Sequence, residues 1–212
     1  MNNVIEIRDV TLKLGGVDIF QSASAEFETG RTYGIVGPNG VGKSVLFKLI
    51  CGFHTPTSGE VWVRPELMSP RRTFPDRFGI IINGPAYLGG LSGVDNLREL
   101  AKIRNRIDVR KIRSTMLRVG LDPESTKRVR TYSLGMKQKL ALAQALMEDP
   151  DVYILDEPFN ALDAASTKRA KEIVRELQAA GKTILFTSHN RADIDELSDQ
   201  VYMIDERALC RA

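Results

Sequence analysis

Residues 37–44 constrain this chain more than any other segment, because they read Gly-Pro-Asn-Gly-Val-Gly-Lys-Ser. Glycines at 37, 40 and 42 tolerate the backbone angles that turn successive N–H groups inward around phosphate oxygens. Lys43 can then reach the β- and γ-phosphates, and the Ser44 hydroxyl can bind Mg²⁺. A short apolar run precedes the octet, and residues 45–50 read as a helix whose N-terminal dipole attracts anions. The octet predicts a phosphate-binding loop (P-loop), and a glycine-rich turn without a ligand is the alternative.

Length and composition agree with one α/β domain. The chain has 212 residues, of which 42% are hydrophobic and 27% charged, as is ordinary for a protein with its own core. No segment approaches the roughly 18 apolar residues of a membrane span, and the start is not a signal peptide, so we expect a cytosolic protein unless something else holds it at a membrane. Two isolated cysteines suit a reducing compartment, and a net charge of +3 is too small to indicate a nucleic-acid partner.

Strand-like and helix-like segments alternate along the chain. The strands predicted from apolar and β-branched runs cover residues 4–12, 31–36, 59–63, 77–82, 152–155, 183–187 and 200–204. A polar, helical middle runs from 93 to 147, with a breaker at 120–123. We interpret this middle as a helical subdomain inserted between two halves of a nucleotide-binding core.

A second chemical site follows the apolar strand at 152–155, which ends in Asp156 and Glu157. Buried carboxylates are costly unless they bind something. Asp156 is placed to hold Mg²⁺ through water next to Ser44, and Glu157 to polarise the water that attacks the γ-phosphate. A strand that runs out into an acidic turn is the alternative, which the P-loop upstream disfavours.

A third candidate is the segment Tyr132-Ser133-Leu134-Gly135-Met136, which a helix-like stretch at 137–146 follows. Ser133 is a good N-cap, and Gly135 allows close approach of a ligand, so a second helix N-terminus could face an anion. Taken alone, this pattern is more typical of an ordinary capped helix.

In this order, the three motifs resemble those of the ATP-binding cassette (ABC) ATPases, over residues 4–207. The resemblance implies a P-loop NTPase core of the RecA-like type with a mostly parallel sheet, an N-terminal antiparallel β region and an inserted α-helical subdomain. The core with the β region would cover 1–83 and 148–212, and the helical signature subdomain 84–147. The variant Tyr-Ser-Leu-Gly-Met, together with residues 81–88, looks most like the bacterial bacitracin or lantibiotic export and immunity group.

The resemblance also implies residue roles. The catalytic residues would be Glu157, the switch histidine His189 and Lys43. Nucleotide contacts would come from Gly37, Pro38, Asn39, Gly40, Val41, Gly42, Lys43, Ser44, Val45 and Leu14. The signature loop facing the partner's ATP would contain Ser133, Leu134, Gly135 and Met136, and the D-loop at the dimer interface Ala161, Leu162 and Asp163. Mg²⁺ would be held by Ser44, Asp156 and Asn83.

Three positions depart from the family pattern. Asn83 stands where the family usually has Gln, Leu14 where an aromatic side chain stacks on adenine, and Val45 where a hydroxyl meets the α-phosphate. Loss of the stacking alone would weaken binding by about 1 kcal/mol. All three predict weaker ATP binding by the isolated subunit.

The leading hypothesis is an ATP-hydrolysing motor subunit of a membrane exporter. Two subunits, identical or different, would sandwich two ATP molecules head to tail and drive a separate transmembrane permease by closing and opening. The protein would lie peripherally on the inner face of the cell membrane through that permease. The permease would dock near residues 83–91, where Pro85, Tyr87 and Leu88 form an apolar patch, and core packing is the alternative use of that patch.

Three other functions stay open. A non-transport ABC protein would act on ribosomes or DNA, but the chain has one P-loop and no room for a long coiled coil. A regulatory nucleotide-binding module would close on ATP and hydrolyse it weakly, as the three departures allow. A small-molecule P-loop kinase shares residues 37–44 but gives no reason for Ser133, Glu157 and His189 in this order.

Overall fold

A computed structural model gives the structure of the protein and describes residues 2–68, 74–84 and 87–212. Within these residues the strands form two sheets, an antiparallel one in the order β2-β1-β4 and a larger one in the order β5-β6-β7-β3-β8-β9. The strands are β1 (Asn3–Leu14), β2 (Val17–Glu28), β3 (Thr32–Val36), β4 (Ser58–Val63), β5 (Phe78–Ile81), β6 (Val152–Leu155), β7 (Thr183–Phe186), β8 (Gln200–Asp205) and β9 (Ala208–Arg211). Neighbouring strands of the larger sheet are parallel except β8 and β9.

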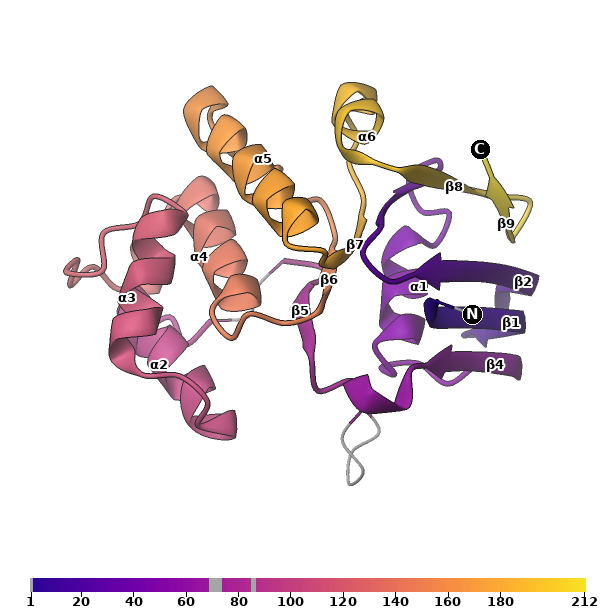
Figure 1. The fold of residues 1–212 in the computed structure, drawn as a ribbon, viewed down its shortest axis with the longest axis horizontal. Helices are drawn as coiled ribbons and strands as arrows, with labels where there is room; N and C mark the ends of the chain where they lie inside the picture. The colour runs from indigo at the N-terminus through magenta and orange to yellow at the C-terminus, as the bar shows by residue number, and fades with distance from the viewer. Residues whose placement is uncertain (1, 69–73, 85–86) are drawn as a thin grey trace.

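Most helices in the described part of the chain begin at a side-chain cap. The helices are α1 (Lys43–Ile50), α2 (Gly93–Arg104), α3 (Val109–Arg118), α4 (Leu134–Leu146), α5 (Ala164–Ala179) and α6 (Arg191–Leu197), with short 3₁₀ turns η1 (Pro65–Leu67) and η2 (Val129–Thr131). Helices α2 and α3 pack through α4 onto the larger sheet (Figure 1). The side chains that accept a backbone N–H hydrogen bond at the start of a helix are Ser92, Asp108, Ser133, Asp163 and Asn190. None of the described helices is long and apolar enough to cross a membrane.

The larger sheet separates two hydrophobic clusters. Along β6, Tyr153 and Leu155 belong to the cluster of α2 to α6, whereas Val152 and Ile154 belong to the cluster of α1 and the smaller sheet. Successive side chains of a strand point to opposite faces, so a fully apolar strand fits a sheet covered on both sides. In Figure 1, α2, α3 and α4 form one end of the molecule and the smaller sheet, with α1 beside it, forms the other.

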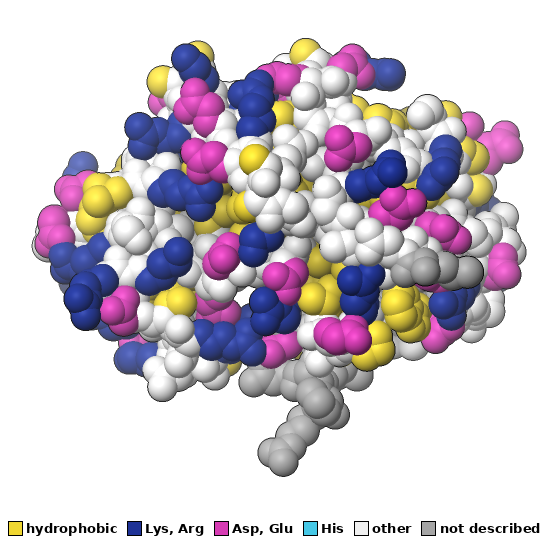
Figure 2. Space-filling model, viewed as in Figure 1, with side chains coloured by type: hydrophobic (Ala, Val, Ile, Leu, Met, Phe, Trp, Pro, Cys, Tyr) yellow, Lys and Arg dark blue, Asp and Glu magenta, His cyan; other side chains and the backbone are white. Residues whose placement is uncertain are grey.

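Charge is divided unevenly between these ends. Residues 84–147 contain 13 Lys and Arg against 5 Asp and Glu, whereas the rest of the chain contains 17 against 22. Figure 2 shows dark blue Lys and Arg side chains gathered over the end of the molecule that α2, α3 and α4 form. The small net charge of the whole chain therefore hides a basic end.

The structure corrects the predicted elements in two places. The sequence prediction missed β2 and β9. In β2 the run Gln21-Ser22-Ala23-Ser24 has small or polar side chains, and Ser22 has a φ of 46°, within a stretch where the pairing with β1 shifts register. Pairing with β1 along its whole length makes this segment a strand, and β9 likewise depends on β8. The other predicted strands agree with the structure to within two residues at each end.

Candidate functional site

The P-loop joins the end of β3 to the start of α1 through a left-handed backbone. Gly37, Gly40 and Gly42 have φ values of 148°, 79° and 114°. A Cβ atom at Gly37 would lie 2.9 Å from the carbonyl oxygen of Ile204, so a side chain there would collide with β8. These angles and contacts explain why glycine is needed, and the start of a helix at this point offers unpaired N–H groups to an anion.

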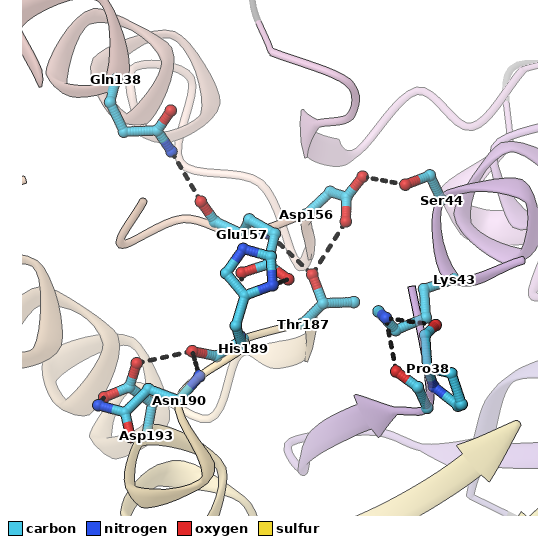
Figure 3. A network of polar contacts seen from close by, with 12 residues as sticks. Pro38, Lys43, Ser44, Gln138, Asp156, Glu157, Thr187, His189, Asn190 and Asp193 are labelled. Atoms are coloured by element: carbon cyan, nitrogen blue, oxygen red, sulfur yellow. Dashed lines mark hydrogen bonds and ion pairs between the residues drawn. The ribbon is translucent and has the colours of Figure 1, made fainter. Parts of the chain in front are cut away.

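Lys43 lies folded over this loop. Its Nζ donates hydrogen bonds to the carbonyl oxygens of Gly37 at 2.7 Å and Pro38 at 3.1 Å (Figure 3). The ammonium lines a cavity of about 580 Å³, which Ser188, His189 and Arg191 close from the segment after β7. A polyphosphate in this cavity would meet the P-loop on one side and the histidine on the other.

Ser44 and Asp156 meet although 112 positions separate them in the sequence. The Ser44 hydroxyl donates to Oδ2 of Asp156 at 2.5 Å, and Thr187 donates to Oδ1 at 2.9 Å (Figure 3). Thr187 is fully buried and follows β7, the parallel neighbour of β6. Parallel strands end at the same edge of a sheet, so the tertiary fold orients both carboxylate oxygens of Asp156.

Glu157 is held in an unusual backbone conformation next to His189. Its φ is 51°, and its backbone N–H donates to the Thr187 hydroxyl at 2.8 Å. Oε1 lies 3.1 Å from Nδ1 of His189, and the His189 backbone N–H donates to Oε2 at 3.2 Å. Burial raises the pKa of Glu157 above its ordinary value, against the opposing effect of His189. A carboxylate with a raised pKa is a better general base near neutral pH.

A buried carboxylate on α6 anchors the loop that carries His189. Asp193 is 4% exposed, accepts a hydrogen bond from the Ser188 hydroxyl at 2.7 Å and lies 2.6 Å from Nζ of Lys171. The imidazole itself is 59% exposed. The loop therefore has a fixed base and an accessible ring.

The predicted signature residues begin α4. Ser133 accepts a hydrogen bond from the Met136 backbone N–H at 3.2 Å, which confirms its role as the N-cap. Leu134 is 68% exposed, and Met136 is partly buried against the helical core. A Cβ atom at Gly135 would lie 2.8 Å from the carbonyl oxygen of Ala161, so α4 packs directly on the predicted D-loop.

The predicted D-loop leads into α5. Ala161 has a φ of 61°, Leu162 packs against the helical core, and Asp163 caps α5 by accepting from the Ser166 backbone N–H at 2.7 Å. This hydrogen bond lowers the pKa of Asp163. A charged cap at a helix N-terminus is favourable.

The three positions that depart from the family pattern lie in different parts of the fold. Asn83 is exposed, has a φ of 56° and follows β5, whose Ile81 carbonyl accepts a hydrogen bond from the Asp156 N–H at 2.8 Å. Leu14 lies at the tip of the β1–β2 hairpin opposite Val17. Val45 is partly buried in the first turn of α1 and packs against the core on that side.

The predicted apolar patch at 85–88 is divided by the structure. Pro85 lies outside the described residues. Tyr87 packs against the helical core and donates its hydroxyl to the Lys137 carbonyl at 2.7 Å, as the core-packing alternative expected. Leu88 is 59% exposed. Only Leu88 of the described pair therefore has the exposure of a docking residue.

Sequence reasoning assigned no function to two residues that the structure places in this site. In the sequence, Thr187 ends a predicted strand and Gln138 lies within a predicted helix. For Thr187, the signal in the sequence is a hydroxyl directly after a buried strand. Gln138 lies on the buried side of α4, together with Ala141 and Leu142, and a buried amide needs hydrogen-bond partners.

Comparisons with known proteins agree on one family. A family model described as ABC transporter matches residues 20–160. The chain is 32% identical over 208 residues to the bacitracin transport ATP-binding protein BcrA of Enterococcus faecalis, which covers 97% of this chain and 68% of that protein. It is 30% identical over 209 residues to the lantibiotic transport ATP-binding protein SrtF of Streptococcus pyogenes, covering 96% and 87%. The predicted resemblance to this group is confirmed.

Among solved structures, the fold is similar to the dimeric post-hydrolysis state of the ATP-binding cassette MJ0796 bound to ADP and Pi. The TM-score is 0.87 at 18% sequence identity, and the match covers 98% of this chain and 97% of that one. The predicted fold class, a mostly parallel α/β core with an antiparallel β region and added helices, is confirmed.

Proposed function

Because this chain belongs to the ABC transporter family, we propose that it is the ATP-binding and ATP-hydrolysing motor subunit of an exporter and drives a separate membrane subunit through ATP-dependent dimer closure. The relatives named above are transport proteins, so the non-transport alternative gains no support from them. A subunit that binds ATP but hydrolyses it weakly is the alternative, because Leu14, Val45 and Asn83 depart from the family pattern.

One observation carries the proposal. Ser44 after the P-loop, Asp156 and Glu157 after β6, and Thr187 and His189 after β7 form one connected set of polar contacts. Burying so many polar and charged groups costs free energy. The reaction that would use all of these side chains is the attack of water on a terminal phosphate.

The residues present fit Mg²⁺ bound together with ATP. Mg²⁺ prefers hard oxygen ligands and is usually held by one or two side chains plus phosphates. The Ser44 hydroxyl and the Asp156 carboxylate, 2.5 Å apart, offer such oxygens, and Thr187 holds Asp156 in place. Asn83 is proposed as a further, amide ligand. When bound, the ion would neutralise charge on the phosphates.

The residues of the chain then divide the remaining work. The P-loop N–H groups and Lys43 would bind the phosphates, with Leu14 next to adenine and Val45 next to the α-phosphate. Glu157 would accept a proton from the attacking water, since burial raises its pKa. His189 would orient the γ-phosphate from the opposite side of the cavity, because Asp193 anchors its loop. Residues 133–136 and 161–163 would meet the second subunit.

We propose that the protein lies at the inner face of the cell membrane through a permease. The basic end formed by α2, α3 and α4 suits the negative charge of that face. A cavity of about 460 Å³ between this end and the core, lined by Phe78, Leu100 and Ile103 among others, lies on the β5 side. Its lining also contains charged side chains such as Arg104, Arg106 and Glu148, so it offers the permease a mixed apolar and charged contact, and Leu88 is a separate exposed apolar residue. The division into a core at 1–83 and 148–212 and a helical part at 84–147 belongs to the same proposal.

Purification from solubilised membranes tests this function. The tagged chain is expected to be recovered with a membrane protein of several spans, and the complex is expected to hydrolyse Mg-ATP, with turnover lost in Glu157→Gln. A chain recovered only from the aqueous fraction, with Mg-ATP turnover equal in the wild type and Glu157→Gln, would refute it.

A further inference from the structure

Gln138 connects the signature helix to the backbone of the proposed catalytic carboxylate. It lies in the second turn of α4 and is 9% exposed. Its Nε2 donates hydrogen bonds to the carbonyl oxygens of Glu157 at 3.1 Å and Pro158 at 3.0 Å. Figure 3 shows the amide reaching from α4 toward the Glu157 carbonyl, on the opposite side from Thr187.

The segment that Gln138 holds needs support, because its backbone is strained. Glu157 and Ala161 have φ values of 51° and 61°, a region that residues with a Cβ rarely adopt. Such conformations persist where the surroundings determine them from several directions. The Glu157 N–H is held by the Thr187 hydroxyl, its carbonyl by Gln138, and the far end of the segment packs under Gly135.

Through these contacts, the first two turns of α4 hold the backbone of residues 157–161 in its conformation. Gly135 contacts Ala161 at one end and Gln138 bonds Glu157 at the other. A shift of α4 along or away from this segment breaks both contacts, and the Glu157 side chain then loses the backbone that aims it at His189. The position of the signature helix is thereby transmitted to the carboxylate within one chain.

We propose that Gln138 is a positioning residue for Glu157, which couples the placement of the signature helix to the proton-accepting geometry. The inference rests on the proposed role of Glu157. Gln138 has no proposed contact with ATP. Removal of its amide should therefore lower turnover and leave the affinity for ATP unchanged.

The test is Gln138→Met, which keeps the length and shape of the side chain but removes the donor. A matched control is Gln178→Met on α5, since Gln178 also bridges two oxygens, those of the Thr32 hydroxyl at 2.9 Å and the Leu197 carbonyl at 2.6 Å, away from Glu157. Mg-ATP turnover, ATP affinity by titration and the unfolding midpoint are measured for both full-length variants. A second variant, Gln138→Asn, keeps the amide on a shorter side chain.

We expect Gln138→Met to lower kcat by about tenfold to hundredfold, as a misplacement of about 1 Å does, with ATP affinity within about twofold of the wild type. Gln178→Met is expected to lower the unfolding midpoint with kcat within about twofold. Gln138→Asn is expected to behave as Gln138→Met does. Unchanged turnover in Gln138→Met, or an equal loss of turnover in Gln178→Met, would overturn the inference.

The Glu157→Gln variant shows whether a negative result concerns the role of Gln138 or the proposed role of Glu157 itself. If Glu157→Gln is inactive while Gln138→Met turns over normally, the coupling through Gln138 is wrong and the role of Glu157 stands. If Glu157→Gln turns over at the wild-type rate, the role of Glu157 is wrong and the positioning argument falls with it.

Discussion

The site at the ends of β3, β6 and β7 and the signature segment at the start of α4 both place polar groups at a helix N-terminus, yet they are held differently. In the first, Ser44, Asp156 and Thr187 bond one another across the sheet. In the second, the Ser133 side chain caps its own helix, and Leu134 beside it is 68% exposed. The first arrangement is assembled by the fold of one chain. The second leaves an apolar side chain exposed, which fits the proposed contact with a second subunit.

This difference predicts that substitutions in the two regions fail in different assays. Changes at the strand ends should alter binding or turnover in any state of assembly. Changes at the exposed start of α4 should act only when two subunits meet.

Glu157→Gln is expected to have the largest effect. The amide keeps the shape of the side chain but cannot accept the proton, so turnover of Mg-ATP should fall by about 10²-fold to 10⁴-fold while ATP affinity is preserved. Steady-state hydrolysis and a binding titration measure the two effects. Wild-type hydrolysis in this variant would remove Glu157 from catalysis.

Lys43→Ala should weaken ATP binding strongly. A hydrogen bond to a charged group contributes about 1.5–3 kcal/mol, which corresponds to a loss of affinity of about tenfold to hundredfold or more when several are lost. Lys48→Ala, in the same helix, is the matched control and should bind as the wild type does. Equal affinities in the two variants would contradict the P-loop assignment.

Leu134→Asp tests directly whether the start of α4 meets a second subunit. In a Glu157→Gln background, Mg-ATP is expected to produce dimers in a sedimentation experiment, and the added carboxylate should weaken them by about tenfold or more, because it would face the partner's phosphates. ATP affinity of the monomer should change by less than about twofold.

Leu117→Asp is the control for that experiment, since Leu117 is an exposed leucine of α3 with 58% exposure. It should leave the dimers intact. Dimers that form equally well with Leu134→Asp would show that this segment does not meet the partner, and ATP-independent monomers in the parent variant would point to a different cassette or the permease as the partner.

The smallest effect concerns stability. The pKa of Glu157 is raised above 4.5 by burial, so the folded state binds this proton more tightly than the unfolded state and ionised Glu157 destabilises the fold at neutral pH. Glu157→Gln should therefore raise the unfolding midpoint at pH 7 to 8. The gain should shrink as pH falls through the raised pKa and vanish below about 4.5. A gain that is independent of pH would contradict this.

Much of the site could be predicted because its motifs are local. The P-loop needs three glycines at fixed spacing between a strand and a helix, and Ser133 needs only the N–H group of Met136, three residues away, to cap α4. The fold class followed from the alternation of apolar strands with helices. By contrast, β2 was missed because its middle is polar and its strand character comes from pairing with β1.

The sequence by itself determined which side chains can do chemistry here: a lysine and a serine behind three glycines, and two carboxylates after an apolar strand. Only the tertiary structure decided how they are oriented. Thr187 reaches Asp156 across 31 positions and Gln138 reaches Glu157 across 19, because parallel strands end at a common edge and α4 packs on the loop beyond it. Contacts of that kind depend on which strands are neighbours and on where helices dock, and the local sequence around either partner does not name the other partner.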